Sequence, residues 1–235
     1  MNIIDLAVLL VLAFFVLSGI YKGFLPTVMG IAANIVSWAC GMIFMPIISN
    51  LVTGSEKLFS MLLYYTEGAE FIGDVELAKR SIESISAAEL NTAVNGSSLP
   101  YPFAKEIVEN VNNRAFAGAG ATTLGDYYNE TIVCVVINII SFCLIFFVLR
   151  LILGFLIEGV DYSLRLPVLT QLNTPLSAGF GLLNGVGILF VVFTVMPLIL
   201  VALNFGFVHD IVDGSLFAPV FYNSSWLLSL MPGTC

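Results

Sequence analysis

Charge is what this sequence has least of. Only 10% of its 235 residues are charged, whereas a soluble domain carries roughly 25%. A single soluble core buries only part of the surface of its chain, and here 59% of the residues are hydrophobic, with a mean hydropathy of +1.01. The scarcity of charge therefore argues against an ordinary soluble domain and predicts a protein whose solvent is the lipid bilayer.

Basic residues are especially rare. The chain has eight Lys and Arg against sixteen Asp and Glu, which gives a net charge of −8, and the basic residues do not cluster. Neutralising the phosphates of a nucleic acid requires clustered Lys and Arg. No nucleic-acid partner is therefore expected.

Catalytic and metal-binding motifs are also missing. There is no CxxC pair for zinc and no HExxH, GxSxG or glycine-rich phosphate loop. Three of the four cysteines, Cys40, Cys134 and Cys143, lie inside apolar runs and are expected to act as small hydrophobic side chains rather than disulfide partners. These absences predict a protein that is not an enzyme and that holds no cofactor and no metal.

The single histidine is the one place that offers the elements of a metal site. His209 stands beside Asp210 and Asp213, and a transition metal accepts imidazole and carboxylate ligands. A membrane enzyme would have to use this group. Because acidic residues often lie near a histidine by chance, we prefer the interpretation that the three residues lie at the membrane interface without a metal.

Long apolar runs are what the sequence has in abundance. Four of them reach the ~20 residues that a membrane-spanning helix requires. The beginning of the chain carries Asp5 and lacks the basic residues that open a signal peptide, so the first run is expected to be a retained helix. Pro197 lies inside the fourth run, and a kink is expected at Pro46 in the second. The sequence predicts an all-α integral membrane protein with four transmembrane helices, at Ile3–Tyr21, Pro26–Val52, Thr131–Ile157 and Leu176–Phe205.

The basic residues of the short loops predict the orientation. Lys22 lies between the first two helices, while Arg150 and Arg165 flank the connection between the last two. Basic loops stay in the cytoplasm, so both connections are expected inside and both termini outside. Four regions result, namely 1–53 and 131–207 with two membrane helices each, an extracytoplasmic insertion at 54–130 and an extracytoplasmic tail at 208–235.

The insertion differs from the rest of the chain in its composition. It carries eleven acidic and five basic residues, hence a net charge of −6. Ser86 and Glu89 match a capping box at a helix start, and Pro100 and Pro102 are expected to break the chain. Apolar residues at helical spacing predict one helix through Phe71, Val75, Ala78, Ile82 and Ile85 and another through Phe103, Ile107 and Val111.

Two further segments are apolar but too short to span a membrane. The segment 158–174 mixes apolar residues with Asp161 and Arg165 and is expected to lie along the inner interface. The tail from Phe217 to Met231 is expected to form an interfacial helix, with Tyr222 and Trp226 in the aromatic belt of the outer face.

Small residues at four-residue steps line one face of the second helix and one face of the fourth. Such faces let helix backbones approach closely, which is how helices associate in lipid. Packing inside the protein is one interpretation, and packing between the subunits of a homo-oligomer is the other. The residues concerned are Ala33, Ser37 and Gly41, and Ser177, Gly181 and Gly185.

Three asparagines, Asn34, Asn138 and Asn184, lie in the middle of predicted membrane helices. An amide in hydrocarbon needs a partner, so these side chains are expected to face the protein interior. They either hold helices together or line a polar path for a solute. With no ionisable residue expected deep in a span, a proton-coupled transporter is disfavoured. Asp5 is expected to be a solvated residue at a helix N-terminus.

The order of these features resembles the colicin V production protein family of bacterial inner-membrane proteins. The resemblance begins with Ile4-Asp5 and continues with the hairpin of Lys22, Gly23 and Phe24. It then includes Leu166-Pro167-Val168-Leu169, Leu172-Asn173, Gly181 and Asn184-Gly185, and Ser215-Leu216 with Pro219. Thr174-Pro175 departs from the family, in which a basic residue is common.

The resemblance implies a protein of the bacterial inner membrane that is associated with the production or export of a peptide toxin. On this basis the preferred hypothesis is a non-enzymatic scaffold or accessory of secretion and envelope processes. The lipid bilayer would be one partner, and envelope or secretion proteins could bind the acidic outer segment. A small channel or transporter is the alternative, suggested by the three asparagines.

Overall fold

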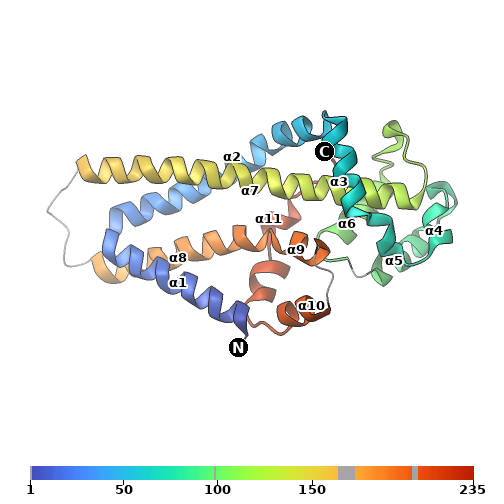
Figure 1. Cartoon of the computed structure of the whole chain (residues 1–235). Helices are drawn as coiled ribbons and strands as arrows, with labels where there is room; N and C mark the ends of the chain where they lie inside the picture. Colours follow the sequence, from blue (N-terminus) through green and yellow to red (C-terminus); the bar gives the residue numbers. More distant parts are fainter. Residues whose placement is uncertain (1, 98, 164–172, 203–205) are drawn as a thin grey trace. The chain divides into compact units, whose positions relative to one another are not determined.

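The computed structural model describes residues 2–97, 99–163, 173–202 and 206–235, and these residues are helical with no strand among them (Figure 1). Four stretches of helix are long and apolar enough to cross a membrane. They belong to α1 (Ile3–Lys22), α2 (Phe24–Thr53), α7 (Leu124–Ser163), and α8 (Asn173–Phe193) followed by α9 (Met196–Ala202). The predicted all-α membrane protein with four apolar spans is thus confirmed.

Local sequence signals explain where α1 begins and ends. The Asn2 side chain accepts a hydrogen bond from the Ile4 backbone, and the Asp5 side chain accepts one from the Asn2 backbone, which together form a capping box. At the other end, Gly23 takes a φ of 86°, which favours glycine. Its N–H donates to the Gly19 carbonyl, so the chain leaves α1 and enters α2 at once.

The two prolines of the spans behave differently. α2 continues as one helix through Pro46, and the kink predicted there stays a prediction. The fourth span, predicted as one helix from Leu176 to Phe205, is interrupted between Phe193 and Met196. Pro197 has no N–H to donate and its ring collides with the carbonyl four residues earlier, and that residue is Phe193, where α8 ends. Residues 203–205 lie outside the described part.

The chain forms two compact units, described here one at a time. The first unit comprises Met1–Met45, Phe142–Met196 and Phe205–Ser225. It contains α1, the beginning of α2, the end of α7 and α8, together with α10 (Gly206–Asp213) and a π-helical turn, η4 (Pro219–Asn223). Its main helix pair is α1 with α8.

The second unit comprises Pro46–Ser141, Pro197–Asn204 and Trp226–Cys235. Its core consists of large side chains that are fully buried, among them Phe103, Ile107, Leu124, Tyr127 and Ile132. Short helices surround this core, namely α3 (Glu56–Thr66), η1 (Gly68–Ile72), α4 (Val75–Lys79), η2 (Ile82–Ser84), α5 (Ala87–Gly96), α6 (Phe103–Asn112), η3 (Ala117–Ala119) and α11 (Trp226–Ser229).

The insertion was predicted in part correctly. The capping box of Ser86 and Glu89 starts α5, and the helix through Phe103 is α6. The single helix predicted over residues 71–85 is wrong, because that stretch forms η1, α4 and η2 instead. Gly73 takes a positive φ of 71° after η1. The Asp74 and Ser81 side chains then accept backbone hydrogen bonds and begin new helices.

The tail departs from the single interfacial helix that the sequence predicted. It forms η4 and the one-turn helix α11. Tyr222, expected in the outer aromatic belt, is buried, whereas Trp226 is 44% exposed. Of the segment expected along the inner interface, residues 158–163 continue α7, and residues 164–172 lie outside the described part. Arg165 is among the latter.

Backbones of α1 and α8 touch at glycines. A Cβ atom at Gly181 would lie 2.5 Å from the Phe15 carbonyl oxygen, and one at Gly19 would lie 2.5 Å from the Ser177 carbonyl oxygen. A Cβ at Gly185 would lie 3.0 Å from the Phe15 Cβ. The small-residue face of α8 therefore packs against α1 of the same chain, where a larger side chain does not fit.

We expect Gly181→Leu to destabilise the protein by ~1–3 kcal/mol, because overpacking forces the neighbouring helix to move. Gly179→Leu is the matched control, since Gly179 is exposed on the same helix and a Cβ there would meet no described atom within 4 Å. The measurement is thermal unfolding of the purified variants in one detergent. Equal midpoints for the two variants would show that α1 and α8 do not pack in this way.

Candidate functional site

A chain of three polar side chains lies inside the first unit. The Arg150 Nε donates a hydrogen bond of 2.6 Å to the Asn34 Oδ1. The Asn34 Nδ2 in turn donates one of 2.6 Å to the Asn184 Oδ1. Asn34 and Asn184 are buried, at 2% and 8% exposure. These two hydrogen bonds link α2, α7 and α8 through polar groups that would find no partner in hydrocarbon.

The chemistry of arginine fixes the direction of every bond in this chain. A guanidinium has donors and no acceptor, so the oxygen of Asn34 must face Arg150. The amide nitrogen of Asn34 therefore faces the oxygen of Asn184. The Asn184 Nδ2 is then left outside these two hydrogen bonds, and a Cβ at Gly30 would lie 3.1 Å from it. The series of side chains from Arg150 through Asn34 consequently ends at Asn184 in a hydrogen-bond donor.

A cavity of about 810 Å³ lies beside this chain, within the first unit. α1, α2, α7 and α8 all contribute to its wall. At its rim the Lys22 Nζ and the Glu158 Oε1 form an ion pair of 3.0 Å, with both side chains about half exposed. The polar and charged side chains of the wall are those of Ser18, Tyr21, Lys22, Thr27, Arg150, Glu158 and Asn184.

The cavity was not predicted from the sequence, because Arg150 was counted among the charges that flank the connection between the last two spans. The structure extends α7 to Ser163, and the apolar span within it reaches Gly159. Arg150 therefore lies nine residues before the end of the span, about 14 Å along the helix. The expectation that no ionisable group lies deep in a span is wrong for this residue. The signal was present, since Arg150 is the only charge in the apolar run from 131 to 157.

The third intramembrane asparagine belongs to a different cluster, in the second unit. The Asn138 Nδ2 donates to the carbonyl oxygens of Pro232 and Thr234, at 2.9 and 3.0 Å. Its Oδ1 accepts a hydrogen bond of 2.6 Å from the Ser49 hydroxyl. Asn138 thus holds the C-terminal residues through its amide nitrogen and α2 through its amide oxygen.

A disulfide joins Cys134 to Cys235 in the same region. The prediction that Cys134 acts as a small hydrophobic side chain is therefore wrong. The two cysteines are 101 residues apart, so no local spacing indicated the pairing. Cys40 and Cys143 are free cysteines. Cys143 fits the expected role of a small buried side chain.

α6 adds a third contact to the C-terminal residues. The Asn110 Nδ2 donates hydrogen bonds of 2.9 Å to the Gly233 carbonyl oxygen and the Thr131 hydroxyl. Glu106 lies beside Gly233, is 5% exposed, and its carboxylate pairs with Lys105 at 3.3 Å. Burial raises the pKa of Glu106, while Lys105 opposes this effect.

Asp5 is buried and accepts several hydrogen bonds, and it is not the solvated residue that was expected. Its Oδ1 accepts hydrogen bonds from the Ser215 hydroxyl at 2.7 Å and from the backbone of Leu216 and Phe217 at 2.8 and 3.2 Å. Its side chain is fully buried. Two stretches of the family resemblance, Ile4-Asp5 and Ser215-Leu216, are 210 residues apart and meet here.

Searches with this chain gave no match to a family model, a curated protein or a solved structure. The resemblance to the colicin V production family therefore rests on the residues quoted above and stays a prediction.

The remaining positions of that resemblance have local roles. Lys22 forms the ion pair at the cavity rim, Gly23 ends α1 and Phe24 begins α2. The ring of Phe24 packs against that of Phe180 at 5.4 Å. Asn173 begins α8, and nothing of its side chain is described.

The small-residue face of α2 is buried. Ala33 is 5% exposed and Ser37 is fully buried. A Cβ at Gly41 would lie 2.8 Å from the Phe142 ring. In the first unit this face therefore approaches α7, whereas the matching face of α8 lies against α1.

Among the described residues, no group of three or more His, Cys, Asp or Glu side chains lies close enough together to hold a metal ion. His209, Asp210 and Asp213 lie on α10, and both aspartates are exposed.

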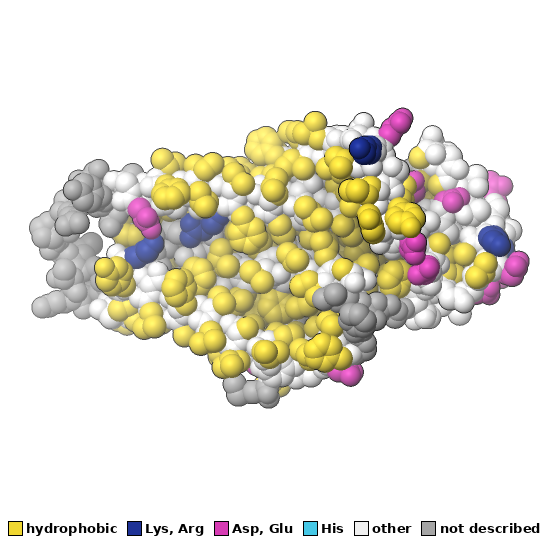
Figure 2. All heavy atoms as spheres, in the orientation of Figure 1, with side chains coloured by type: hydrophobic (Ala, Val, Ile, Leu, Met, Phe, Trp, Pro, Cys, Tyr) yellow, Lys and Arg dark blue, Asp and Glu magenta, His cyan; other side chains and the backbone are white. Residues whose placement is uncertain are grey.

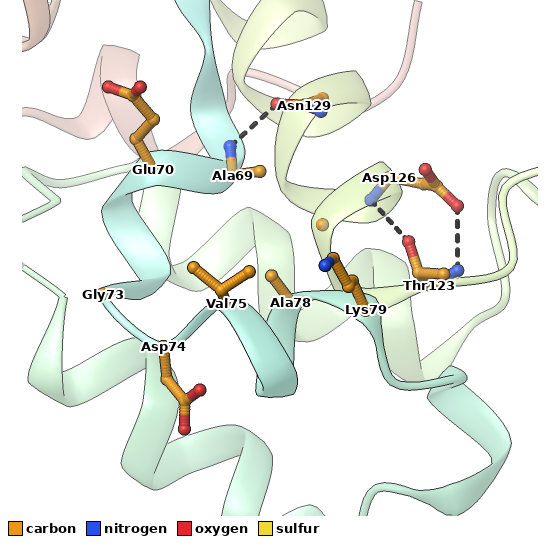
Figure 3. A pocket seen from close by; sticks show the side chains of 11 residues that line it. Ala69, Glu70, Gly73, Asp74, Val75, Ala78, Lys79, Thr123, Asp126 and Asn129 are labelled. Carbon is orange, nitrogen blue, oxygen red and sulfur yellow. Dashed lines mark hydrogen bonds between the residues drawn. The ribbon is translucent and has the colours of Figure 1, made fainter.

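A second cavity, of about 550 Å³, lies in the second unit (Figure 3). Val75 and Ala78 point into it, while the carboxylates of Glu70 and Asp74 point away. The Asp126 carboxylate accepts backbone hydrogen bonds from Thr122 and Thr123. The acidic groups of this second cavity therefore do not converge on one point where a ligand could bind. The cavity beside Arg150 is the stronger candidate site.

We expect Asn184→Leu to destabilise the protein by ~1–2 kcal/mol, because it leaves the Asn34 amide without its acceptor. Asn223→Leu removes the same amide from an exposed position and should change little. The measurement is again thermal unfolding in one detergent. A silent Asn184→Leu would contradict the bonded chain of Arg150, Asn34 and Asn184.

Proposed function

We propose that the chain is a non-enzymatic protein of the bacterial inner membrane that assists peptide production, secretion and envelope processes as a scaffold or accessory. The observation that carries this proposal is the bond between Asn34 and Asn184. A polar path for solutes would keep both amides open to its lumen, whereas here Asn34 binds Asn184 through its nitrogen and Arg150 through its oxygen. Asn138 is likewise taken up by its bonds to Ser49 and the C-terminal residues.

The orientation proposed from the basic loops is supported by an independent feature. Disulfides persist in oxidising compartments outside the cytoplasm, and Cys235 is joined to Cys134. A C-terminus outside the cytoplasm agrees with the placement of Lys22 inside. In this orientation the insertion, with its net charge of −6, faces the outside and offers an acidic surface to envelope or secretion proteins.

A small transporter or channel is the second candidate. Asn184 also borders the 810 Å³ cavity together with Arg150 and the Lys22–Glu158 pair, and a polar cavity among membrane helices is where a solute could bind.

Thiol labelling tests the proposed orientation. In a protein whose free cysteines Cys40 and Cys143 are replaced by alanine, Ser84→Cys should react with a membrane-impermeant reagent in intact cells. Glu158→Cys, at a charged side chain that is 64% exposed near the end of α7, should react only after lysis. The reverse pattern would overturn the orientation.

Crosslinking in native membranes tests the proposed function. The wild-type protein should capture an envelope or secretion component, identified by mass spectrometry. The triple variant Glu56→Gln, Glu70→Gln and Glu76→Gln should lose it, because these exposed acids belong to the insertion. Asp210→Asn with Asp213→Asn removes exposed charge elsewhere and should retain the partner.

Two results would contradict the scaffold. One is that no component is captured by the wild-type protein. The other is that the purified protein alone, reconstituted in vesicles, lets a solute cross and loses this activity on Asn184→Leu, which would favour the transporter.

A further inference from the structure

The cavity beside Arg150 is rich in hydrogen-bond donors. Among the residues that the structure describes, Asn34 is the one acceptor recorded for the Arg150 side chain, and it takes the Nε. The two terminal nitrogens lie near glycines, since a Cβ at Gly154 would be 3.7 Å from one and a Cβ at Gly30 would be 3.6 Å from the other. Neither glycine carries a side chain that could accept a hydrogen bond.

The free amide nitrogen of Asn184 adds a donor beside the same glycine. Gly30 and Asn184 both line the cavity, and a Cβ at Gly30 would lie 3.1 Å from the Asn184 Nδ2. One terminal nitrogen of Arg150 and the Asn184 Nδ2 thus both lie beside Gly30. A guanidinium and an amide that donate side by side form an arrangement that binds a phosphate or carboxylate.

The charges of the wall also favour an anion. Among the described residues of the wall, Arg150 and Lys22 are positive and Glu158 is negative, which gives a net charge of +1. Glu158 is already paired with Lys22. The terminal nitrogens of Arg150 thus keep a charge that no described acid of the wall neutralises.

The surroundings of the cavity decide which anion is expected. Phe14 and Tyr21 form part of its wall and are 65% and 91% exposed. On α7, Leu151 and Phe155 lie next to Arg150 and Gly154 in sequence and are 61% and 68% exposed. Figure 2 shows basic and acidic side chains gathered within a hydrophobic surface at the end of the first unit that contains the α1–α2 turn. In a membrane such a surface faces acyl chains.

We infer that the cavity binds the phosphate of an anionic phospholipid through Arg150 and Asn184, with its acyl chains along the apolar side chains of α1 and α7. Basic pockets between membrane helices on the cytoplasmic side bind anionic head groups. Lys22 places the rim of this cavity at the helix ends assigned to that side, and the cavity extends from there to Arg150 inside the span. The inference does not depend on a scaffolding role, since it concerns the purified protein alone.

Lipid binding to the purified protein tests the inference. The protein in nonionic detergent is given phosphatidylglycerol, phosphatidylcholine or inorganic phosphate, and bound lipid is counted by native mass spectrometry while the unfolding midpoint is recorded. Phosphatidylglycerol should bind and raise the midpoint more than either of the other two.

Three variants locate the site. Arg150→Gln should weaken phosphatidylglycerol binding ~10-fold or more, the scale of losing hydrogen bonds to a charged group. Gly154→Leu keeps the charge but fills the space beside the guanidinium, and a Cβ there meets no backbone within 4 Å, so this variant should fold and lose the lipid as well. Arg114→Gln removes an exposed charge from the insertion and should bind as the wild type does.

Two outcomes would overturn the inference. The first is equal binding of phosphatidylglycerol and phosphatidylcholine, or binding that survives both Arg150→Gln and Gly154→Leu. The second is stabilisation by inorganic phosphate as strong as that by phosphatidylglycerol, which would assign the cavity to a soluble anion.

Discussion

A polar group inside an apolar helix has to find its partner within the protein, because lipid supplies neither donors nor acceptors. This requirement explains why the buried amides of the two units occur in bonded clusters. In the first unit Asn34 stands between a donor, Arg150, and an acceptor, Asn184. In the second, Asn138 satisfies two backbone carbonyls of the C-terminal residues and one hydroxyl. Each cluster ties together segments that are far apart in sequence.

The features predicted correctly from the sequence are those that neighbouring residues decide. Apolar runs of sufficient length gave the four spans, and Ser86 with Glu89 gave the start of α5. Where a local signal competes with a periodic one, the local signal wins. Apolar residues recur at helical steps over residues 71–85, yet Gly73 and the capping side chains of Asp74 and Ser81 divide this stretch into three elements.

The features that were missed depend on residues far apart in the chain. The pairing of Cys134 with Cys235 cannot be deduced from spacing. The role of Asp5 depends on Ser215, whose hydroxyl is buried against it. Arg150 was misjudged because it was counted with the loop charges, although it lies inside the predicted span 131–157 as well as inside α7. An arginine counted as a loop charge therefore proved to be a half-buried partner of an asparagine.

α8 holds the first unit together because its faces offer different kinds of contact. Ser177, Gly181 and Gly185 present backbone to α1. Asn184, rotated about 100° from Gly185, presents an amide to α2, and Gly187 leaves room there for the ring of Trp38. At the end of the helix the Thr194 hydroxyl lies 3.5 Å from the sulfur of Cys143 on α7. Close approach at the glycines brings α8 near enough to α1 to enclose the cavity, and the amide fixes its rotation toward Arg150. The cavity beside Arg150 therefore depends both on the glycine contacts between α8 and α1 and on the hydrogen bond between Asn184 and Asn34.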